Sequence, residues 1–293
     1  MDNPFCAGIA AVVITYFPPE NLLENIRSYA PFADVVYVFD NSTPAADLNL
    51  LHSLGNVQVI SNHDNLGIAV NLSRAAQLAL DAGYSWLLTM DQDSRFAPGV
   101  FENYIGCVQA YAQHDQVAQF GPTFEPDVFV STPACTPQVV RSMITSGCLV
   151  NLQHFQFVGG FDEQLFIDLV DFDYCIRARA KGLQLIMFRN IFLEHDLGKT
   201  VTRASIKTLY FKKKTKKLHD PLRCYYIYRN LLYLTKKLKH LDAEAVTYMW
   251  RTMKGPLFAN FFYGRFAALM LRYLWKARKD FTAGRMGRIN KPG

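Results

Sequence analysis

The sequence predicts an α/β fold built around a parallel sheet, with a basic helical extension at its C-terminal side. Short apolar runs rich in β-branched residues alternate with segments of helical periodicity between residues 9 and 91, which is the pattern of β-α-β units. No G-x-x-x-x-G-K-[ST] or G-x-G-x-x-G motif follows the first run. The sequence therefore weighs against P-loop and dinucleotide-binding enzymes.

Proline and glycine residues indicate where the expected strands and helices end. The first strand ends at Pro18-Pro19, because proline has no amide hydrogen for a central ladder, and the helix from Ile68 closes at Gly83, a usual residue after a helix. Residues 97–138 predict one helix and otherwise irregular or edge-strand structure. The expected strands are residues 9–17, 35–39, 57–60 and 86–90, and the expected helices are residues 20–29, 68–82 and 100–111, with another that ends at Ala180.

Two carboxylates stand one residue apart after the buried run of residues 86–90, in the segment Asp91-Gln92-Asp93-Ser94. Because side chains alternate along an extended chain, Asp91 and Asp93 would face one point. Paired carboxylate oxygens suit a hard divalent ion such as Mg²⁺ or Mn²⁺. The same segment also suits a polar turn, and its spacing alone leaves both interpretations open.

Polar residues follow two other expected strands. Thr15-Tyr16 ends the first strand, and Asp40-Asn41-Ser42 follows the second. The carboxyl ends of parallel strands share one edge of a sheet, and ligands of open α/β sheets bind at that edge. We therefore expect a site there that includes Asp91-Gln92-Asp93.

Charge divides the chain into two parts. Residues 1–198 hold 8 Lys and Arg against 21 Asp and Glu, a net −13, whereas residues 199–293 hold 23 against 4, a net +19. The 293 residues are 50% hydrophobic, which is ample for a core. We expect a catalytic domain over residues 1–200 and a basic helical region over residues 201–293 that meets an anionic surface.

The six cysteines are scattered and include no C-x-x-C pair, so we expect no zinc site. A chain of this size needs no disulfides for stability, and no secretory signal is visible at its start. We therefore expect reduced thiols in a cytoplasmic protein. No apolar run approaches the ~18 residues of a membrane span.

Residues 258–281 predict an amphipathic helix. Its basic residues recur at helical spacing, and its large apolar residues fall mostly on the remaining surface. Such a helix fits the surface of an anionic membrane, and it also fits packing on the catalytic domain with its charges in water. The basic residues are Arg265, Arg272, Lys276 and Lys279, and the apolar residues are Phe261, Phe262, Phe266, Leu269, Met270, Tyr273 and Leu274.

The motifs together resemble the inverting glycosyltransferases of family 2, and within them the bacterial rhamnosyltransferase branch. Val13-Ile14-Thr15-Tyr16, Asp40-Asn41-Ser42, Asn65-Leu66-Gly67-Ile68-Ala69 and Asp91-Gln92-Asp93 resemble the nucleotide-binding and metal-binding segments. Gly159-Gly160-Phe161-Asp162-Glu163 and Asp171-Phe172-Asp173 resemble the turn and the acidic motif of the general base. Arg223-Cys224-Tyr225-Tyr226 with Arg229-Asn230 resembles the rhamnosyl signature. The resemblance spans about the whole chain and implies the GT-A fold, a Rossmann-like nucleotide-binding sheet flanked by helices.

The resemblance also implies roles for the matched residues. Asp171 would be the general base, alone because Val170 stands where many relatives have Glu, with Asp168 as the alternative. Asp93 and His195 would hold the metal, with Asp91 on the metal or the ribose. The nucleotide sugar would contact Thr15, Tyr16, Asp40, Asn65, Gly67, Asn71, Arg74 and Asp91, and the acceptor or donor site would include Gly147, Asp168, Asp173, Arg223, Tyr226 and Arg229.

The implied reaction is inverting transfer of L-rhamnose from dTDP-β-L-rhamnose. The acceptor would be a lipid-linked saccharide for O-antigen, capsule or cell-wall polysaccharide, at the cytoplasmic face of the inner membrane. Mg²⁺ or Mn²⁺ would neutralise the departing diphosphate, and the base would take the acceptor's proton. The alternatives are transfer of another sugar, a nucleotidyltransferase, or nucleic-acid binding through Lys212-Lys213-Lys214, which leaves the acidic half without a role.

Overall fold

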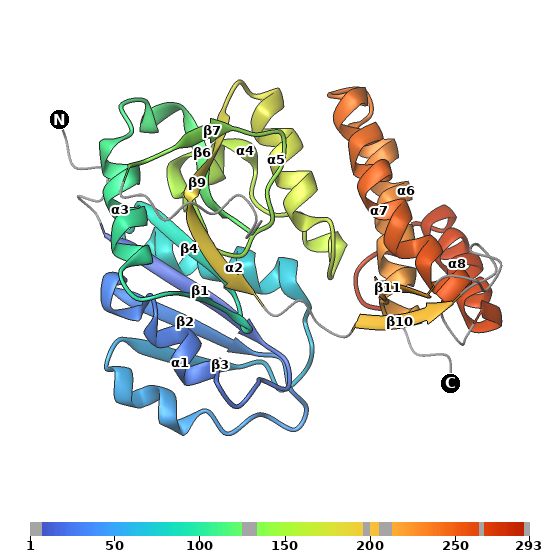
Figure 1. Cartoon of the computed structure of the whole chain (residues 1–293), viewed down its shortest axis with the longest axis horizontal. Coiled ribbons are helices and arrows are strands. Elements are labelled where there is room, and N and C mark those ends of the chain that lie inside the picture. The colour runs from blue at the N-terminus through green and yellow to red at the C-terminus, as the bar shows by residue number, and fades with distance from the viewer. Residues whose placement is uncertain (1–7, 125–133, 196–199, 205–212, 264–266, 290–293) are drawn as a thin grey trace.

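The computed structural model describes residues 8–124, 134–195, 200–204, 213–263 and 267–289, which form two lobes (Figure 1). A large sheet with helices on both faces forms the first lobe. The second lobe contains β10 (Thr200–Ala204), β11 (Lys213–Lys217), α6 (Pro221–Leu238), α7 (Ala243–Tyr263) and α8 (Ala267–Thr282). The lysine run of the nucleic-acid alternative, which we do not expect to bind nucleic acid, lies partly in β11, and Lys212 is outside the described residues.

The large sheet is parallel in one half and mixed in the other. The described strands follow the order β3-β2-β1-β4-β8-β6-β9-β5, with β7 beside β9. Strands β1, β2, β3 and β4 run parallel as predicted, whereas β8 is antiparallel to β4 and to β6. The strands are β1 (Ile9–Thr15), β2 (Val35–Asp40), β3 (Val57–Ser61), β4 (Trp86–Asp91), β5 (Ser94–Phe96), β6 (Val117–Thr123), β7 (Pro137–Val139), β8 (Cys148–Asn151) and β9 (Gln184–His195).

Burial on both faces explains why the central strands are continuously apolar. Every residue of β1 is buried. Ala10 and Val12 pack in the core under α2, whereas Ala11 and Val13 pack in the core with α1 and α3. Alternation therefore exposes neither face to water. The helices of this lobe are α1 (Leu22–Arg27), α2 (Ile68–Asp81), α3 (Val100–Ala110), α4 (Leu152–Val158) and α5 (Val170–Ala180).

The two lobes share one hydrophobic core. The cluster that contains Ala10 and Val12 of β1 continues through Leu231 of α6 and Met249 of α7 to Met270 of α8. Helices α6, α7 and α8 confirm the predicted helical C-terminal region, but the described residues before α6 form the strand pair β10 and β11. The packing of the three helices depends on the sheet lobe. A domain boundary near residue 200 stays a proposal.

Strand β6 corrects the prediction of irregular or edge-strand structure for this part of residues 97–138. All of its residues are buried, and it lies between β8 and β9. Gly121 and Pro122 concealed it, because both residues are poor formers of central strands. The register of β6 against β9 shifts between Pro122 and Thr123, which is where a sheet tolerates a proline.

The cysteines correct a second prediction. Cys107 of α3 and Cys135, just before β7, form a disulfide across 28 residues of sequence, although we expected only reduced thiols. Cys148, Cys175 and Cys224 are buried thiols, as expected, and Cys6 lies outside the described residues. The spacing could not reveal the pair, because the fold alone brings these two Cα atoms to 5.4 Å.

The C-terminal segment differs from the single helix predicted over residues 258–281. α7 ends at Tyr263 and α8 begins at Ala267, whereas Arg265 and Phe266 lie outside the described residues. Among the helices that the structure describes, none is long and apolar enough to cross a membrane.

Candidate active site

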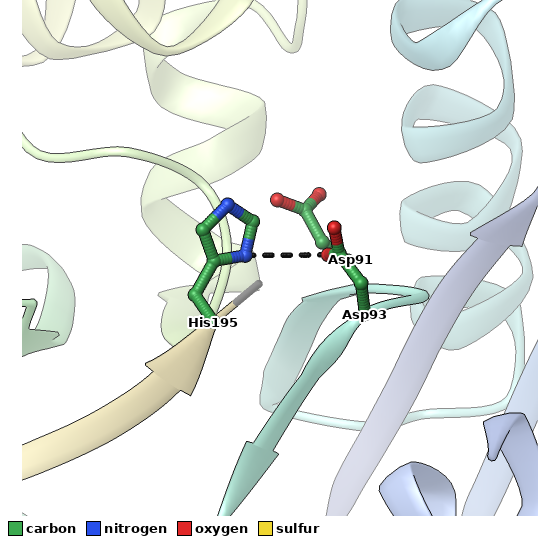
Figure 2. Close-up of side chains that lie close together, drawn as sticks. All are labelled: Asp91, Asp93 and His195. Atoms are coloured by element: carbon green, nitrogen blue, oxygen red, sulfur yellow. Dashed lines mark ion pairs between the residues drawn. The ribbon is translucent and has the colours of Figure 1, made fainter. Parts of the chain in front are cut away.

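Three metal-ligating side chains converge at the carboxyl edge of the sheet (Figure 2). Asp91 ends β4, Asp93 lies in the turn to β5, and His195 ends β9. β5 pairs with β9 so that Ser94 lies opposite His195, which brings the histidine to the two carboxylates. One ligand atom of each residue lies within 4.8 Å of the others, and His195 Nδ1 is 3.2 Å from Asp93 Oδ1.

The electrostatics of this triad suit a divalent cation. Burial and the neighbouring charge of Asp93 raise the pKa of Asp91 to about 6, against the opposing effects of His195 and Arg223. Two carboxylates that repel each other in a half-buried place are stabilised when a cation binds between them. Carboxylate oxygens together with an imidazole form a donor set that Mn²⁺ accepts, so these residues fit a metal.

Two serines, Ser94 and Ser146, support Asp91 and His195 through hydrogen bonds. Ser94 Oγ lies 2.9 Å from His195 Nδ1, and Ser146 Oγ donates to Ser94 Oγ at 3.0 Å. Ser146 Oγ also accepts from the Asp91 amide at 3.0 Å. Such outer contacts orient metal ligands. Sequence reasoning assigned no role to either serine, although both adjoin predicted motifs.

Asp171 lies in the first turn of α5, half-buried. Burial raises the pKa of its carboxyl group to about 7, and the charges of Asp168 and Asp91 act in the same direction. Asp171 therefore shares the electrostatic field of the triad. A carboxylate with a pKa near neutrality is well suited to accept a proton at physiological pH.

A strained turn precedes Asp171. Asp168 and Leu169 have φ of 63° and 68°, in the left-handed region that side chains other than glycine rarely adopt. Asn230 Nδ2 of α6 donates to the carbonyl oxygens of Ile167 at 2.8 Å and Asp168 at 3.1 Å. Strain of this kind persists only where the surroundings hold it, so α6 supports the position of Asp171.

Arg223, at the start of α6, has a guanidinium group, whose charge and paired donors suit binding of a phosphate. Its guanidinium donates to both carboxylate oxygens of Asp168, and its side chain is 47% exposed. Its charge also lowers the pKa of Asp91. Arg223 therefore contacts the turn before Asp171 directly and acts on Asp91 through its charge, while half of its side chain is open to solvent.

Four residues expected at the acceptor or donor site are instead enclosed by the protein. Arg229 is 1% exposed and lies 5.2 Å from the ring centres of Tyr225 and Tyr226. Asp173 is fully buried between Arg177 and Lys237. Tyr226 stacks on Phe166 at 4.9 Å, and a Cβ on Gly147 would lie 2.6 Å from Pro122. Because these residues are buried among protein groups, we propose supporting roles for them.

Asp40 is also enclosed. Its carboxylate accepts from Thr15 Oγ1 at 3.1 Å, from the Ser42 amide at 3.1 Å and from the Ala46 amide at 2.8 Å. Burial acts to raise the pKa of Asp40, but these hydrogen bonds outweigh it and leave the pKa lowered. The residue holds the loop after β2 in shape. Thr15 is fully buried beside it.

The turn before α2 contacts the segment of residues 166–169 that precedes Asp171. Gly67 has φ 85° and ψ −176°, and the Ile68 amide donates to the Phe166 carbonyl at 2.6 Å. The Gly67 amide donates to Asn65 Oδ1 at 2.9 Å, and buried Asn71 donates to the Gly67 carbonyl at 2.8 Å. Asn65 and Asn71 therefore hold a glycine turn that contacts the residues before Asp168.

Exposed side chains remain after the end of β1 and in the middle of α2. Tyr16 and Phe17 are 50% and 58% exposed. The Tyr16 amide donates to Gln92 Oε1 at 2.9 Å, which joins this loop to the turn that carries Asp91 and Asp93. Arg74 is exposed, and its guanidinium lies 5.0 Å from the centre of the Phe39 ring.

The chain is similar in sequence to known transferases. Residues 10–128 match the model of glycosyl transferase family 2. Over 251 residues the chain is 28% identical to the dTDP-rhamnosyl transferase RfbF of Shigella flexneri, which covers 79% of this chain and 81% of that protein. The sequence therefore resembles glycosyltransferase family 2 over residues 10–128 and a rhamnosyl transferase over most of its length.

Solved structures give the fold of this glycosyltransferase. S. aureus TarS 1–349 in complex with UDP-GlcNAc aligns with a TM-score of 0.57 at 13% identity, over 94% of this chain and 80% of that chain. GalNAc-T7 with UDP, GalNAc and Mn²⁺ aligns with a TM-score of 0.52 at 13% identity, over 66% of this chain and 44% of that longer chain. The GT-A fold and the enzyme class predicted from the sequence are confirmed.

Proposed function

We propose that this glycosyltransferase transfers L-rhamnose from dTDP-β-L-rhamnose to a hydroxyl group of a lipid-linked saccharide, with inversion at the anomeric carbon. The observation that carries the reaction type is the pairing of Asp171, with a pKa of about 7, with the Asp91, Asp93 and His195 triad. The donor is supported by the relative named a dTDP-rhamnosyl transferase.

Asp91, Asp93 and His195 would hold a divalent metal ion, Mn²⁺ or Mg²⁺. When bound, the ion supplies positive charge that stabilises the diphosphate as it leaves. Arg223, whose guanidinium is half-exposed, adds a second positive charge from α6. The exposed ring of Tyr16 offers a surface on which the thymine base stacks.

Asp171 would act as the general base. The acceptor oxygen forms a bond to C1 of the sugar while the bond from C1 to the diphosphate oxygen breaks, and dTDP leaves with the electron pair. The proton of the acceptor hydroxyl passes to the Asp171 carboxylate. The base would lie on the face of the sugar opposite the leaving group. The acceptor then attacks from that face in a single displacement, which inverts the anomeric centre.

A lipid-linked acceptor for surface polysaccharide is the finer part of the proposal. The net charge of +19 over residues 199–293 supports attachment to an anionic membrane surface. We place the enzyme peripherally at the cytoplasmic face of the inner membrane, where nucleotide sugars would be available to it.

The test is a donor screen by thermal stabilisation and metal-dependent hydrolysis, with dTDP-L-rhamnose, UDP-GlcNAc and other sugar nucleotides. We expect dTDP-L-rhamnose to give the largest effect. Stabilisation by UDP-GlcNAc alone, the ligand of the TarS complex, would replace the donor assignment with transfer of another sugar.

Asp171→Asn tests the base. Because a general base acts in the transition state, we expect kcat to fall about 10²–10⁴-fold while the Kd of the donor stays within about twofold. Asp168→Asn is the companion variant. If Asp168→Asn abolished turnover and Asp171→Asn did not, the base would be Asp168.

A further inference from the structure

Helix α8 has two faces, and only one of them packs on the protein. Met270, Ala277 and Asp280 are buried and follow one another at helical spacing. On the opposite side Leu271 is 60% exposed and Trp275 is 67% exposed. A tryptophan and a leucine one helical turn apart expose apolar surface to water, which is unfavourable in free energy unless a partner covers them.

The burial of α8 contradicts part of the prediction for the amphipathic helix of residues 258–281. Met270, Tyr273 and Leu274 were expected on the membrane side, but Met270 lies in the core and the other two pack against core clusters. The exposed large apolar residues of α8 are Leu269, which was predicted, and Leu271 and Trp275, which were not. The helix therefore packs on the protein and still leaves a second apolar surface open.

Cations surround the exposed pair. Arg272, Arg278 and Lys279 are exposed on the same side of α8, and the Lys279 ammonium lies 5.2 Å from the centre of the Trp275 ring. Among the described residues these three cations form no ion pair, whereas Lys276 and Arg285 both bind Asp280. Within the described part of the chain, no ion pair therefore neutralises the positive charge of this face.

We propose that this surface, the α8 face, docks on an anionic lipid bilayer. The α8 face consists of Leu271, Arg272, Trp275, Arg278 and Lys279. Tryptophan settles at the interface between headgroups and acyl chains, and arginine and lysine bind anionic headgroups. A second copy of the chain is a poorer occupant, because a two-fold contact through this face would bring like charges together.

The buried side of α8 packs on α6, the helix that carries Arg223. The Tyr225 hydroxyl donates to Asp280 Oδ2 at 2.7 Å, and Tyr225 is two residues from Arg223 on α6. Bilayer contact through α8 would therefore act on the helix whose Asn230 holds the turn before Asp171. This inference rests on the proposed lipid-linked acceptor for its purpose, but its physical argument is independent of the donor.

The experiment is sedimentation of the full chain with vesicles of phosphatidylcholine and phosphatidylglycerol, compared with vesicles of phosphatidylcholine alone. We expect binding to the anionic vesicles only, and weaker binding at high salt. Leu271→Ala with Trp275→Ala, and separately Arg272→Gln with Arg278→Gln and Lys279→Gln, should each lower binding by roughly tenfold or more.

The matched control is Phe157→Ala with Lys181→Gln. Phe157 is 55% exposed, and the Lys181 ammonium lies 4.4 Å from its ring centre, so the pair repeats the chemistry of Trp275 and Lys279 on the first lobe. The control should bind vesicles as the wild type does. Thermal unfolding and donor hydrolysis should stay unchanged in the α8 variants.

Two outcomes would overturn the inference. One is equal sedimentation of the wild type and the α8 variants with anionic vesicles. The other is a change of oligomeric state in the α8 variants, which would make a second copy the occupant. Failure of dTDP-L-rhamnose hydrolysis with intact vesicle binding would count against the proposed function and leave the α8 face standing.

Discussion

Arg223 holds Asp168 with three hydrogen bonds, from Nε to each carboxylate oxygen at 3.1 Å and from a terminal nitrogen to Oδ1 at 2.8 Å. This pair joins the first turn of α6 to a turn whose residues Asp168 and Leu169 are left-handed. Each such residue costs about 1–3 kcal/mol, which the surroundings must offset. The pair therefore positions Asp171, three residues further on.

Arg223→Lys tests this relationship. Lysine keeps the charge but cannot make the two-point contact of a guanidinium, so the catalytic turn should loosen. We expect kcat to fall by at least about tenfold, because small misplacement of a catalytic group is costly. The measurement is steady-state kinetics with separate kcat and KM. Arg141→Lys, in the exposed pair with Glu244, should leave both constants unchanged, and an equal loss there would point to a general effect on folding.

The rate should depend on pH through Asp171. A base must be deprotonated, and the pKa of this carboxyl is raised to about 7, so kcat should fall tenfold per pH unit below about 7 and level off above it. Asp168→Asn removes a charge that raises this pKa. In that variant the midpoint should move to lower pH. A midpoint near 4 in the wild type would show that Asp171 is not the base.

The same carboxyl should cost stability at alkaline pH. The folded-state pKa of Asp171 lies above its unfolded value, so the native protein binds more protons than the unfolded chain between about pH 4 and 7. Its contribution to stability is therefore present at low pH and lost as pH rises through 7. Asp171→Asn should raise Tm at pH 8 more than at pH 5, measured by thermal unfolding. An equal change in Tm at both values would contradict this.

The sequence predicted the parallel half of the sheet well because its strands are buried on both faces. Continuous apolar runs such as that of β1 are unambiguous when turn residues bound them. Strand β6 was harder, since Gly121 and Pro122 look like breakers until the register shift beside β9 accommodates them.

Site prediction was limited by burial. The spacing of Asp91 and Asp93 identifies them as a candidate pair in the sequence. His195 comes close to them only because β5 pairs with β9, and no local sequence pattern predicts that pairing. Arg229 and Asp173 match the motifs as well as Asp171 does. The structure distinguishes them by burial, because Arg229 is 1% exposed and Asp173 is not exposed, whereas Asp171 is half-buried.

Gly67 should tolerate no side chain. Its φ of 85° disfavours other residues, and an added Cβ would lie 2.4 Å from the Phe166 carbonyl oxygen. Gly67→Ala should therefore cost about 2 kcal/mol or more in the free energy of unfolding, measured by denaturant titration. Gly83→Ala is the matched control, with φ 82° and nothing within 4 Å. It should cost clearly less, and equal losses would remove the role of the Phe166 contact.

The last prediction concerns the metal. An imidazole in the donor set suits Mn²⁺ better than Mg²⁺, which prefers oxygen ligands. Chelation should therefore abolish transfer, and Mn²⁺ should restore it at lower concentration than Mg²⁺. His195→Asn replaces the nitrogen with an amide and should weaken activation by Mn²⁺ by at least about tenfold, with less effect on Mg²⁺.

His114→Asn is the control for this comparison. His114 Nδ1 lies 3.2 Å from Asp115 Oδ1, the same distance that separates His195 Nδ1 from Asp93 Oδ1, but no third acidic group completes a cluster with them among the described residues. Its loss should leave the metal dependence unchanged. Metal titration of the apo-protein by calorimetry separates binding from turnover. If His195→Asn bound Mn²⁺ as tightly as the wild type, the histidine would orient Asp93 rather than ligate the ion.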